Sequence, residues 1–406
     1  MNYGIIVKVL GSLLIFEAFM MVPSLLISLA NKESDLQAFV ISIIITLVAS
    51  FILTRTESES KSIKVKDGLA IVAFGWVLVS FFGSLPFYVS GSIPSFIDAF
   101  FETVSGFTTT GATIINDIEI LPKGVLFWRS FTHWIGGMGI LVFTIALLPS
   151  IGVGGFQIFK AESPGPVTSR ITPRIKDTAK LLYKTYIVIT LVEIVLLLFG
   201  GMSLYDASVH TFGTLGTGGF SVRNSSIGAY NSTYIHLVIG FFMMLSGINF
   251  SLYYSLYNKK WREVFKDEEF KFYLKVISIA TVLIGLNLYT TNYSSAGISL
   301  RDSFFQTSSI ITTTGYATAD FDLWPAFSKA ILFVLMFIGG CAGSTGGGMK
   351  NIRILIMLKM IKRQILKTFH PRAVIPIKIN NKTVTDETVT SISSFIMLYI
   401  LLFIVG

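Results

Sequence analysis

A segment that begins with aspartate and ends in a run of threonine and glycine occurs three times in this chain of 406 residues. The three aspartates are Asp98, Asp206 and Asp302, so successive copies begin 108 and 96 residues apart. Each copy has a threonine five positions after the aspartate and a glycine thirteen positions after it. The two residues before that glycine are only threonine or glycine. This spacing indicates a repeated unit of about one hundred residues.

The chemistry that such a run can offer lies in its backbone oxygens. Carbonyl groups of an extended segment can replace the hydration shell of a cation, and glycine allows backbone conformations that a Cβ atom disfavours. Small residues that pack transmembrane helices closely are the alternative for one copy, but three copies in the same register favour cation coordination. The candidate ion-binding residues are Thr109, Thr110, Gly111, Thr217, Gly218, Gly219, Thr313, Thr314 and Gly315.

A short helix must position each run. The aspartate is expected to cap the start of a helix, where its carboxylate suits free N–H groups and the positive end of the helix dipole. Roughly ten helical residues follow, about 15 Å in length, which is half of a bilayer. Such a half-helix must end inside the protein, and its negative end favours a cation nearby.

The composition is that of a polytopic membrane protein. Hydrophobic residues make up 52% of the chain, charged residues 14%, and the mean hydropathy is +0.70. The single cysteine, Cys341, excludes an intramolecular disulfide framework, and the four histidines are scattered without metal-ligand spacing. No cluster of His, Asp, Glu, Ser or Lys at membrane depth suggests an enzyme. The first apolar stretch indicates a retained span rather than a cleaved signal.

The apolar pattern sets the expected organisation. Membrane spans are predicted at about 4–30, 37–54, 68–89, 124–149, 181–200, 232–256, 273–290 and 389–406. The expected regions are an N-terminal transmembrane hairpin and loop (1–66), repeat 1 (67–150), a cytoplasmic segment with repeat 2 (151–271), repeat 3 (272–370) and the start of a fourth repeat (371–406). A fourth motif would begin near position 415, so the chain is expected to be truncated.

The second span of the third repeat is interrupted by glycine. Six of the ten residues from Gly339 to Gly348 are glycine, which makes a helix interior there unfavourable. The segment 326–338 alone is too short to cross about 30 Å of hydrocarbon, so a broken helix is expected rather than a loop that leaves the membrane. The candidate gate residues are Gly339, Gly340, Gly343, Ser344, Thr345, Gly346, Gly347, Gly348 and Lys350.

Basic residues predict the orientation. The net charge is +9, and 23 of the 32 Lys and Arg residues lie in the loops 55–66, 151–180, 257–271 and 350–387. Four lie in the loops of the opposite side. By the positive-inside rule, the N-terminus is cytoplasmic and the three threonine–glycine runs face outward. This distribution accounts for the positive charge without nucleic acid.

Taken together, these features resemble the Trk-type potassium-uptake membrane subunits of the Trk/Ktr/HKT superfamily. The resemblance spans nearly the whole chain, including the N-terminal hairpin. It rests on the strings Ser105–Thr113, Glu162–Pro166, Thr172–Arg174, Gly201–Asp206, Thr217–Ser221, Ser246–Phe250 and Gly343–Lys350.

The resemblance implies an all-α integral membrane fold in which pseudo-fourfold repeats of span, half-helix and span form a potassium-channel-like pore. It makes Gly111, Gly219 and Gly315 the filter glycines, and glycine at all three positions is similar to the potassium-selective type, whereas some plant relatives with serine in the first filter favour sodium. It also implies a glycine-rich gate below the filter, with Lys350 at its cytoplasmic end.

The expected partners and location follow from the same resemblance. It implies a homodimer in a bacterial plasma (inner) membrane and a cytosolic, nucleotide-binding regulatory subunit (TrkA-like). K⁺ would be the transported ion, and no cofactor is expected in this chain, because any dependence on ATP or NAD would belong to the partner.

Individual polar residues allow two interpretations each. Arg129 and His133 are expected to anchor a span at the interface beside tryptophans, with a functional role as the alternative. Glu193 is expected to pair with a basic residue across the bundle, or to serve transport. Glu102 and Asp98 could enrich cations at the entrance, in addition to the capping expected of Asp98. Asn249 is expected to form a hydrogen bond between spans.

Three other functions stay open at this stage. A sodium or mixed monovalent cation pathway would use the same backbone chemistry. A non-transporting fragment would follow from the missing fourth filter segment. An integral-membrane enzyme is disfavoured, because the chain shows no clustered catalytic side chains.

Overall fold

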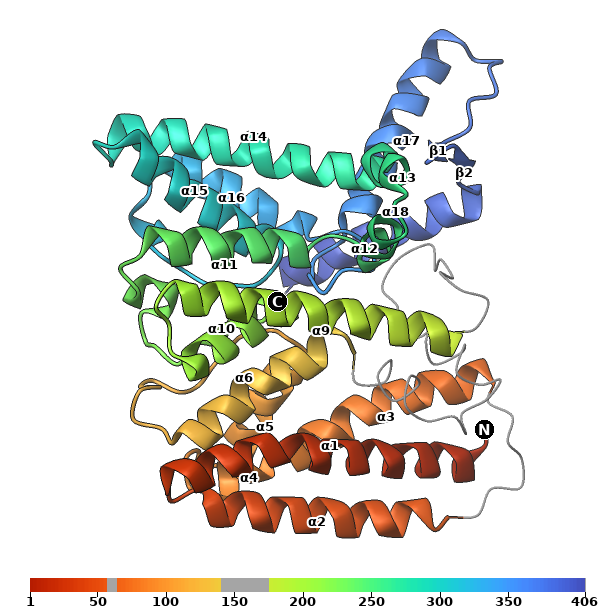
Figure 1. Cartoon of the computed structure of the whole chain (residues 1–406). Helices are drawn as coiled ribbons and strands as arrows, with labels where there is room; N and C mark the ends of the chain where they lie inside the picture. Colours follow the sequence, from red (N-terminus) through yellow and green to blue (C-terminus); the bar gives the residue numbers. More distant parts are fainter. Residues whose placement is uncertain (57–63, 140–174, 406) are drawn as a thin grey trace. The chain divides into compact units, whose positions relative to one another are not determined.

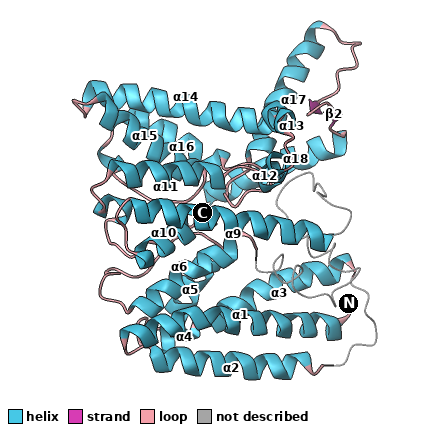
Figure 2. Cartoon of the chain, viewed as in Figure 1, coloured by secondary structure: helices cyan, strands magenta, loops and turns pink. Residues whose placement is uncertain are grey.

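The computed structural model describes residues 1–56, 64–139 and 175–405, which form helices and their connections with one small strand pair (Figures 1 and 2). The described chain divides into two compact units. Unit 1 holds residues 1–139 and 175–242 together with 314–318. Unit 2 holds residues 243–313 and 319–405. Two strings of the resemblance, 162–166 and 172–174, lie outside the described residues, as does the end of the predicted span 124–149 that follows residue 139.

Hydropathy predicts the long spans correctly. Among the described residues, six helices are long and apolar enough to cross a membrane. They are α1 (Tyr3–Asn31), α2 (Leu36–Thr54), α3 with α4 (Val65–Gly83 and Leu85–Val89), the stretch Ala179–Phe199 of α9 (Ile175–Phe199), α14 (Glu268–Thr291) and α18 (Asp386–Val405).

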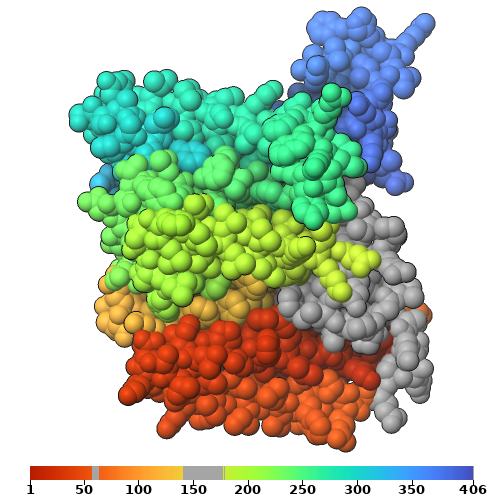
Figure 3. Space-filling model, in the orientation of Figure 1, coloured from red at the N-terminus to blue at the C-terminus, as the bar shows by residue number. Residues whose placement is uncertain are grey.

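Helices α1 and α2 form the predicted N-terminal hairpin of unit 1 (Figure 1). Small residues bring the two helices close together: Gly11 lies against Thr54, and the Ser50 hydroxyl donates to the Gly11 carbonyl at 2.7 Å. The opposite face of α2 is apolar and exposed, with Val48 and Ile52 more than half accessible. The space-filling view shows this hairpin in red and orange at the surface of unit 1 (Figure 3). Such a face suits lipid.

Three short helices precede the threonine–glycine runs, as predicted: α5 (Phe96–Phe107), α10 (Leu204–Gly216) and α15 (Ala296–Ile311) have 12, 13 and 16 residues. The predicted aspartate caps are wrong. Ser95 and Ser203 occupy the cap positions and accept hydrogen bonds from the N–H groups of Asp98 and Asp206. These aspartates therefore lie in the first helical turn, where a negative charge still suits the helix dipole.

The helix after the first run belongs to unit 1. Helix α6 (Lys123–Gly137) packs against both α5 and α10. The approach is close because a Cβ atom on Gly136 would overlap the Phe107 carbonyl, and one on Gly137 would lie 2.6 Å from the Cα of Gly216. Gly136 and Gly137 therefore serve close helix packing.

The predicted continuous span at 232–256 is wrong. The chain forms α11 (Thr233–Ser246) and α12 (Phe250–Tyr257), which are bent by 96° at the break between them. The Asn249 side chain caps α12 by accepting from the N–H of Ser251 at 2.9 Å. Asn249 therefore starts a new helix, and its bond is local instead of joining two spans.

The remaining elements of unit 2 confirm the predicted break in the third repeat. Helix α16 ends at Ile338 and α17 begins at Asn351, with the glycine-rich segment between them. The elements not yet named are the short helices α13 (Trp261–Lys266), η2 (Ser226–Ala229, in unit 1) and η3 (Phe321–Leu323), then α16 (Ala326–Ile338), α17 (Asn351–Phe369) and the strands β1 (Lys378–Ile379) and β2 (Lys382–Thr383).

Candidate cation filter and gate

The three threonine–glycine runs adopt the same backbone pattern. The threonine two positions before each key glycine has a positive φ, 54° at Thr109, 55° at Thr217 and 59° at Thr313. The key glycines also have positive φ values: Gly111 at 77°, Gly219 at 78° and Gly315 at 84°. The residue between each pair is not among those with positive φ. Non-glycine residues seldom adopt positive φ, so the shared pattern points to one specific geometry.

Two of these glycines lie directly against carbonyl groups of the next copy, within unit 1. A Cβ atom on Gly111 would overlap the carbonyl oxygen of Gly218, and a Cβ on Gly219 would overlap that of Thr314. Both carbonyls belong to the residue before the key glycine of the following copy. The runs are therefore adjacent in the order first, second, third. A Cβ on Gly315 would meet open space.

Further contacts fix the end of the third run against the second. The hydroxyl of Tyr316 lies 3.0 Å from the Phe220 carbonyl and 3.1 Å from the His210 carbonyl. The Ala317 carbonyl accepts from the N–H of Gly228 at 3.0 Å. These bonds order the backbone immediately after Gly315.

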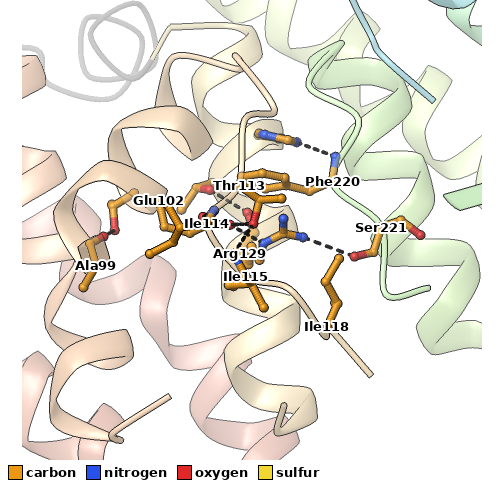
Figure 4. Close-up of polar contacts among 12 residues, drawn as sticks. Ala99, Glu102, Thr113, Ile114, Ile115, Ile118, Arg129, Phe220 and Ser221 are labelled. Carbon is orange, nitrogen blue, oxygen red and sulfur yellow. Dashed lines mark hydrogen bonds and ion pairs between the residues drawn. The ribbon is translucent and has the colours of Figure 1, made fainter. Parts of the chain in front are cut away.

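A buried ion pair lies beside the first two runs (Figure 4). Arg129 Nε donates to Glu102 Oε1 at 2.6 Å, and both side chains are almost fully buried. The Glu102 carboxylate also accepts from Thr113 Oγ1 at 2.9 Å and from the N–H of Ile114 at 3.1 Å. Arg129 Nη1 donates to the Ser221 carbonyl at 3.2 Å. The pair thus connects α5, α6 and the ends of two runs.

The expectations that Glu102 collects cations at the entrance and that Arg129 and His133 anchor a span at the interface are wrong. Glu102 is 1% exposed and cannot collect cations at an open entrance, while Arg129 and His133 are 2% and 0% exposed and cannot anchor a span at an interface. His133 Nδ1 instead accepts from the N–H of Phe220 at 3.4 Å. The segment 128–134 contains two tryptophans, which is typical of a membrane interface. Only the tertiary contacts show that Arg129 and His133 are buried in the protein instead.

Glu193 lies fully buried on α9, and neither of its carboxylate oxygens has a hydrogen-bond partner among the described residues. No basic residue forms an ion pair with it in the described part of the chain. The expected pairing across the bundle is therefore not found there.

In unit 2, the glycine-rich loop between α16 and α17 is ordered by hydrogen bonds to the break between α11 and α12. The Gly247 carbonyl accepts from the N–H of Cys341 at 2.8 Å, and the Gly343 carbonyl accepts from the N–H of Phe250 at 2.9 Å. A broken helix leaves backbone groups without partners. Here the loop supplies these partners, which explains how the chain tolerates the break.

Three side chains complete the support of this loop. One oxygen of Glu269 on α14 accepts from Ala342 N–H at 2.7 Å and Ile352 N–H at 3.0 Å, which joins both ends of the loop. The Lys350 ammonium donates to the carbonyls of Gly346 and Ser344. Thr313 Oγ1 accepts from the N–H of Gly347 at 2.7 Å. Lys350 itself is buried and has a φ of 72°.

Sequence reasoning missed two features of this arrangement. Glu269 lies in a charged segment of the sequence, where nothing distinguishes it from its charged neighbours as a functional residue. The break at 247–249 lies inside an apolar stretch that hydropathy treats as one span. The pair of glycine and asparagine inside that stretch was the available signal, because each disfavours a helix interior.

Fold and site define a polytopic, mostly helical membrane protein. Three short helices lead into glycine-containing runs, and a glycine-rich break separates α16 from α17. The family model described as "TrkH: Cation transport protein" matches residues 35–406. The chain belongs to this cation transport family, which consists of transporters and not of enzymes.

Individual relatives agree with this assignment. The chain is 38% identical over 411 residues to the Trk system potassium uptake protein TrkH of Halomonas elongata, covering 99% of this chain and 84% of that protein. It is 38% identical over 412 residues to TrkH of Escherichia coli, covering 100% and 85%. The crystal structure of the potassium transporter TrkH from Vibrio parahaemolyticus matches with a TM-score of 0.88 at 35% identity, covering 100% of this chain and 85% of that one.

Proposed function

We propose that this protein is a potassium uptake pathway whose selectivity filter consists of backbone carbonyls from residues 109–111, 217–219 and 313–315. The observation that carries the proposal is the contact of Gly111 and Gly219 with the carbonyls of Gly218 and Thr314. It makes successive runs neighbours, as a ring around an ion requires. The printed names of the relatives, which are potassium uptake proteins, support K⁺ as the transported ion.

The shared backbone pattern suits cation coordination. A backbone that alternates between left- and right-handed residues rotates successive peptide planes, so that neighbouring oxygens face the same side. In the runs, positive φ at the threonine and at the glycine flanks a residue without it. Oxygens aligned in this way can substitute for the waters of an ion that enters without its hydration shell. The C-terminal ends of α5, α10 and α15 carry partial negative charges, and their electrostatic potential favours a cation nearby.

The loop from Gly339 to Lys350 is proposed as the gate. Its backbone is held by bonds to the side chains of Glu269, Lys350 and Thr313 and by backbone hydrogen bonds to Gly247 and Phe250. In this proposal, exchange of these hydrogen bonds moves the loop without unfolding a helix. The hydrogen bond from Gly347 N–H to Thr313 Oγ1 supports this proposal, because Thr313 begins the proposed third filter segment. We therefore propose that this loop controls passage and that the filter controls selectivity.

The wider organisation is also proposed. The repeats are assigned to residues 67–150, 151–271 and 272–370, after an N-terminal hairpin and loop of residues 1–66 and before the start of a fourth repeat at 371–406, which together would form a pseudo-fourfold pore. The distribution of basic residues supports a cytoplasmic N-terminus in a bacterial inner membrane. The proposal also includes a homodimer and a cytosolic, nucleotide-binding regulatory subunit that docks on the basic loops.

The test is rubidium and potassium uptake in cells that lack their own potassium systems and express the full-length protein. The proposal predicts saturable uptake of Rb⁺ that K⁺ inhibits and Na⁺ inhibits at least about tenfold more weakly. Equal inhibition by Na⁺ and K⁺ would instead support a sodium or mixed-cation pathway. No uptake, with the protein present in the membrane and its cytosolic partner supplied, would contradict transport.

A further inference from the structure

Two positions of the repeated motif contact each other across the filter segment in the first two copies. The residues four positions after the aspartates are Glu102, His210 and Gln306, and those fifteen positions after them are Thr113, Ser221 and Ala317. Thr113 Oγ1 donates to Glu102 at 2.9 Å, and His210 Nε2 lies 3.0 Å from Ser221 Oγ. In the third copy Ala317 has no hydroxyl, and Gln306 Oε1 has no hydrogen-bond partner among the described residues.

This contact connects a half-helix to the outer end of its own filter segment. Only the first copy makes it with a charged group. Glu102 accepts three hydrogen bonds, from Thr113, Ile114 and Arg129. Bonds to an ionised group are shorter and stronger than neutral ones, and the bonds from Thr113 and Ile114 restrain the backbone two and three residues beyond Gly111.

Arg129 extends the restraint to the second segment. Its Nη1 donates to the Ser221 carbonyl, and its guanidinium carbon lies 3.5 Å from the ring centroid of Phe220, the residue directly after Gly219. The His133 ring stacks on the same Phe220 ring at 4.0 Å with an interplanar angle of 20°. Figure 4 shows Arg129 between the Glu102 side and the Phe220–Ser221 side.

We infer that Glu102 and Arg129 are a positioning pair that holds the outer ends of the first and second filter segments and thereby sets the discrimination between K⁺ and other monovalent cations. The inference rests on the proposed filter. The role is one of positioning, because both side chains are buried and neither is open to a passing ion. Their hydrogen bonds go to backbone groups that follow the proposed filter glycines.

Burial explains why the pair is suited to this task. A buried ion pair contributes little net stability compared with an apolar pair of the same volume, because desolvation of both charges opposes their attraction. Its strict geometry can instead specify one arrangement of the groups around it. Selection between ions by carbonyl groups depends on the number and placement of those groups, and a functional site loosened by about 1 Å already fails.

The experiment uses the full-length protein in cells without their own potassium systems. The first variant is the double substitution Glu102→Gln with Arg129→Met, which removes both charges and leaves no single buried charge. The readouts are membrane abundance, thermal stability, and the ratio of K⁺ to Na⁺ inhibition of Rb⁺ uptake. The matched control is Glu119→Gln with Arg223→Gln, an ion pair of 3.6 Å in the same unit whose side chains are 44% and 42% exposed.

The expected result is a double variant that is present in the membrane, remains folded and transports Rb⁺, but discriminates against Na⁺ at least about tenfold less than the wild type. The control pair should keep the wild-type ratio. If the double variant keeps the wild-type ratio, the positioning role is overturned while the filter stands.

Single substitutions decide the matter if the double variant does not fold. Glu102→Gln keeps the size of the side chain, and Arg129→Lys keeps the charge but loses the planar contact with Phe220. Reduced discrimination in either supports the pair, and wild-type discrimination in both overturns it. A wild-type protein without selective K⁺ uptake would overturn the proposed function and the positioning pair together. Unchanged discrimination in the pair variants, with lost discrimination in a Gly219→Ser variant, would overturn only the pair.

Discussion

Two regions of the molecule are rich in glycine, and different contacts hold them. In unit 1, the filter glycines Gly111 and Gly219 lie so close to neighbouring carbonyls that a Cβ atom would overlap them, and a buried ion pair ties the following residues. In unit 2, the loop from Gly339 to Lys350 is also closely packed, since a Cβ atom on Gly339 would overlap the Gly347 carbonyl, but no ion pair of the described residues supports it. Backbone hydrogen bonds hold this loop together with bonds from a carboxylate, a hydroxyl and an ammonium group.

This difference teaches how one residue type can serve two purposes. In the proposed filter, Gly111 and Gly219 leave room for the carbonyl of the next segment, which a Cβ atom would overlap. In the loop, Gly339, Gly343 and Gly348 have positive φ values that a helix does not contain, so they interrupt the helix. Changes in the first region should therefore alter selectivity, and changes in the second should alter rate and stability.

The largest effect is expected for Gly219→Ala. The new methyl group would overlap the Thr314 carbonyl, and the residue would also carry a positive φ, which costs about 1–2 kcal/mol. We expect K⁺ over Na⁺ discrimination to fall about a hundredfold, which corresponds to nearly 3 kcal/mol. Competition of Rb⁺ uptake by the two ions measures it.

Gly91→Ala is the matched control for this substitution. Gly91 has a φ of 71° but open space at its Cβ position, so it reproduces the backbone cost without the overlap. Equal discrimination in the two variants would show that steric contact with the next segment does not matter.

The second effect concerns the support of the loop by Glu269. Glu269→Leu leaves the N–H groups of Ala342 and Ile352 without their acceptor, and each such loss costs about 1–3 kcal/mol. We expect a loss of about 2 kcal/mol in stability, measured by thermal unfolding of the purified protein. The K⁺ to Na⁺ ratio should not change.

Glu269→Gln separates hydrogen bonding from charge. Its amide oxygen can accept from the same two N–H groups, so most of the stability should return. A glutamine variant as unstable as the leucine variant would mean that the charge, and not the pair of hydrogen bonds, supports the loop.

A smaller effect is expected for Lys350→Met, because the carbonyls of Gly346 and Ser344 lose an ammonium donor. A hydrogen bond to a charged group contributes about 1.5–3 kcal/mol, so we expect uptake in the absence of the regulatory partner to rise about tenfold. The selectivity ratio should stay constant.

Lys259→Met is the control. Lys259 has a positive φ of 58°, as Lys350 has one of 72°, but the side chain of Lys259 is exposed. Its uptake should match the wild type. A fall in K⁺ over Na⁺ discrimination in Lys350→Met, instead of a change in rate, would contradict the separation between the two regions.

The smallest effect is expected at the break that faces the loop. Asn249→Ala removes the cap of α12 and should lower stability by about 1 kcal/mol, whereas Asn249→Asp should retain it. Thermal unfolding of both variants tests this. Equal loss in both would indicate that the asparagine acts through its amide group and not as a cap.

Local pattern was enough to predict six long spans and the short helices before the three runs, because hydropathy and length fix them, but it missed the break in the predicted span 232–256. It also predicted the interruption at Gly339–Gly348, where the glycine content makes a helix unfavourable. The local sequence pattern did not predict contacts between segments that are distant in the chain. The cap at Ser95 in place of Asp98 shows that even short-range detail can escape it, because both residue types suit a helix start.

The candidate site was predictable in its backbone and not in its supports. The repeat singles out Gly111, Gly219 and Gly315, and their positive φ values fit the backbone freedom expected of glycine there. That they bind an ion stays a prediction. Arg129 was interpreted as an interfacial anchor, because a sequence does not show that its partner Glu102 faces it from another helix. The break at Gly247 was hidden for the same reason, since the groups that satisfy it come from the loop about one hundred residues later.

The most direct test of the filter is the location of rubidium by anomalous scattering in crystals of the full-length protein. The account predicts a peak bounded by the carbonyl oxygens of the segments 109–111, 217–219 and 313–315, and its loss in crystals of Gly219→Ala. Rubidium bound only elsewhere, with these three segments ordered and without an ion, would contradict it.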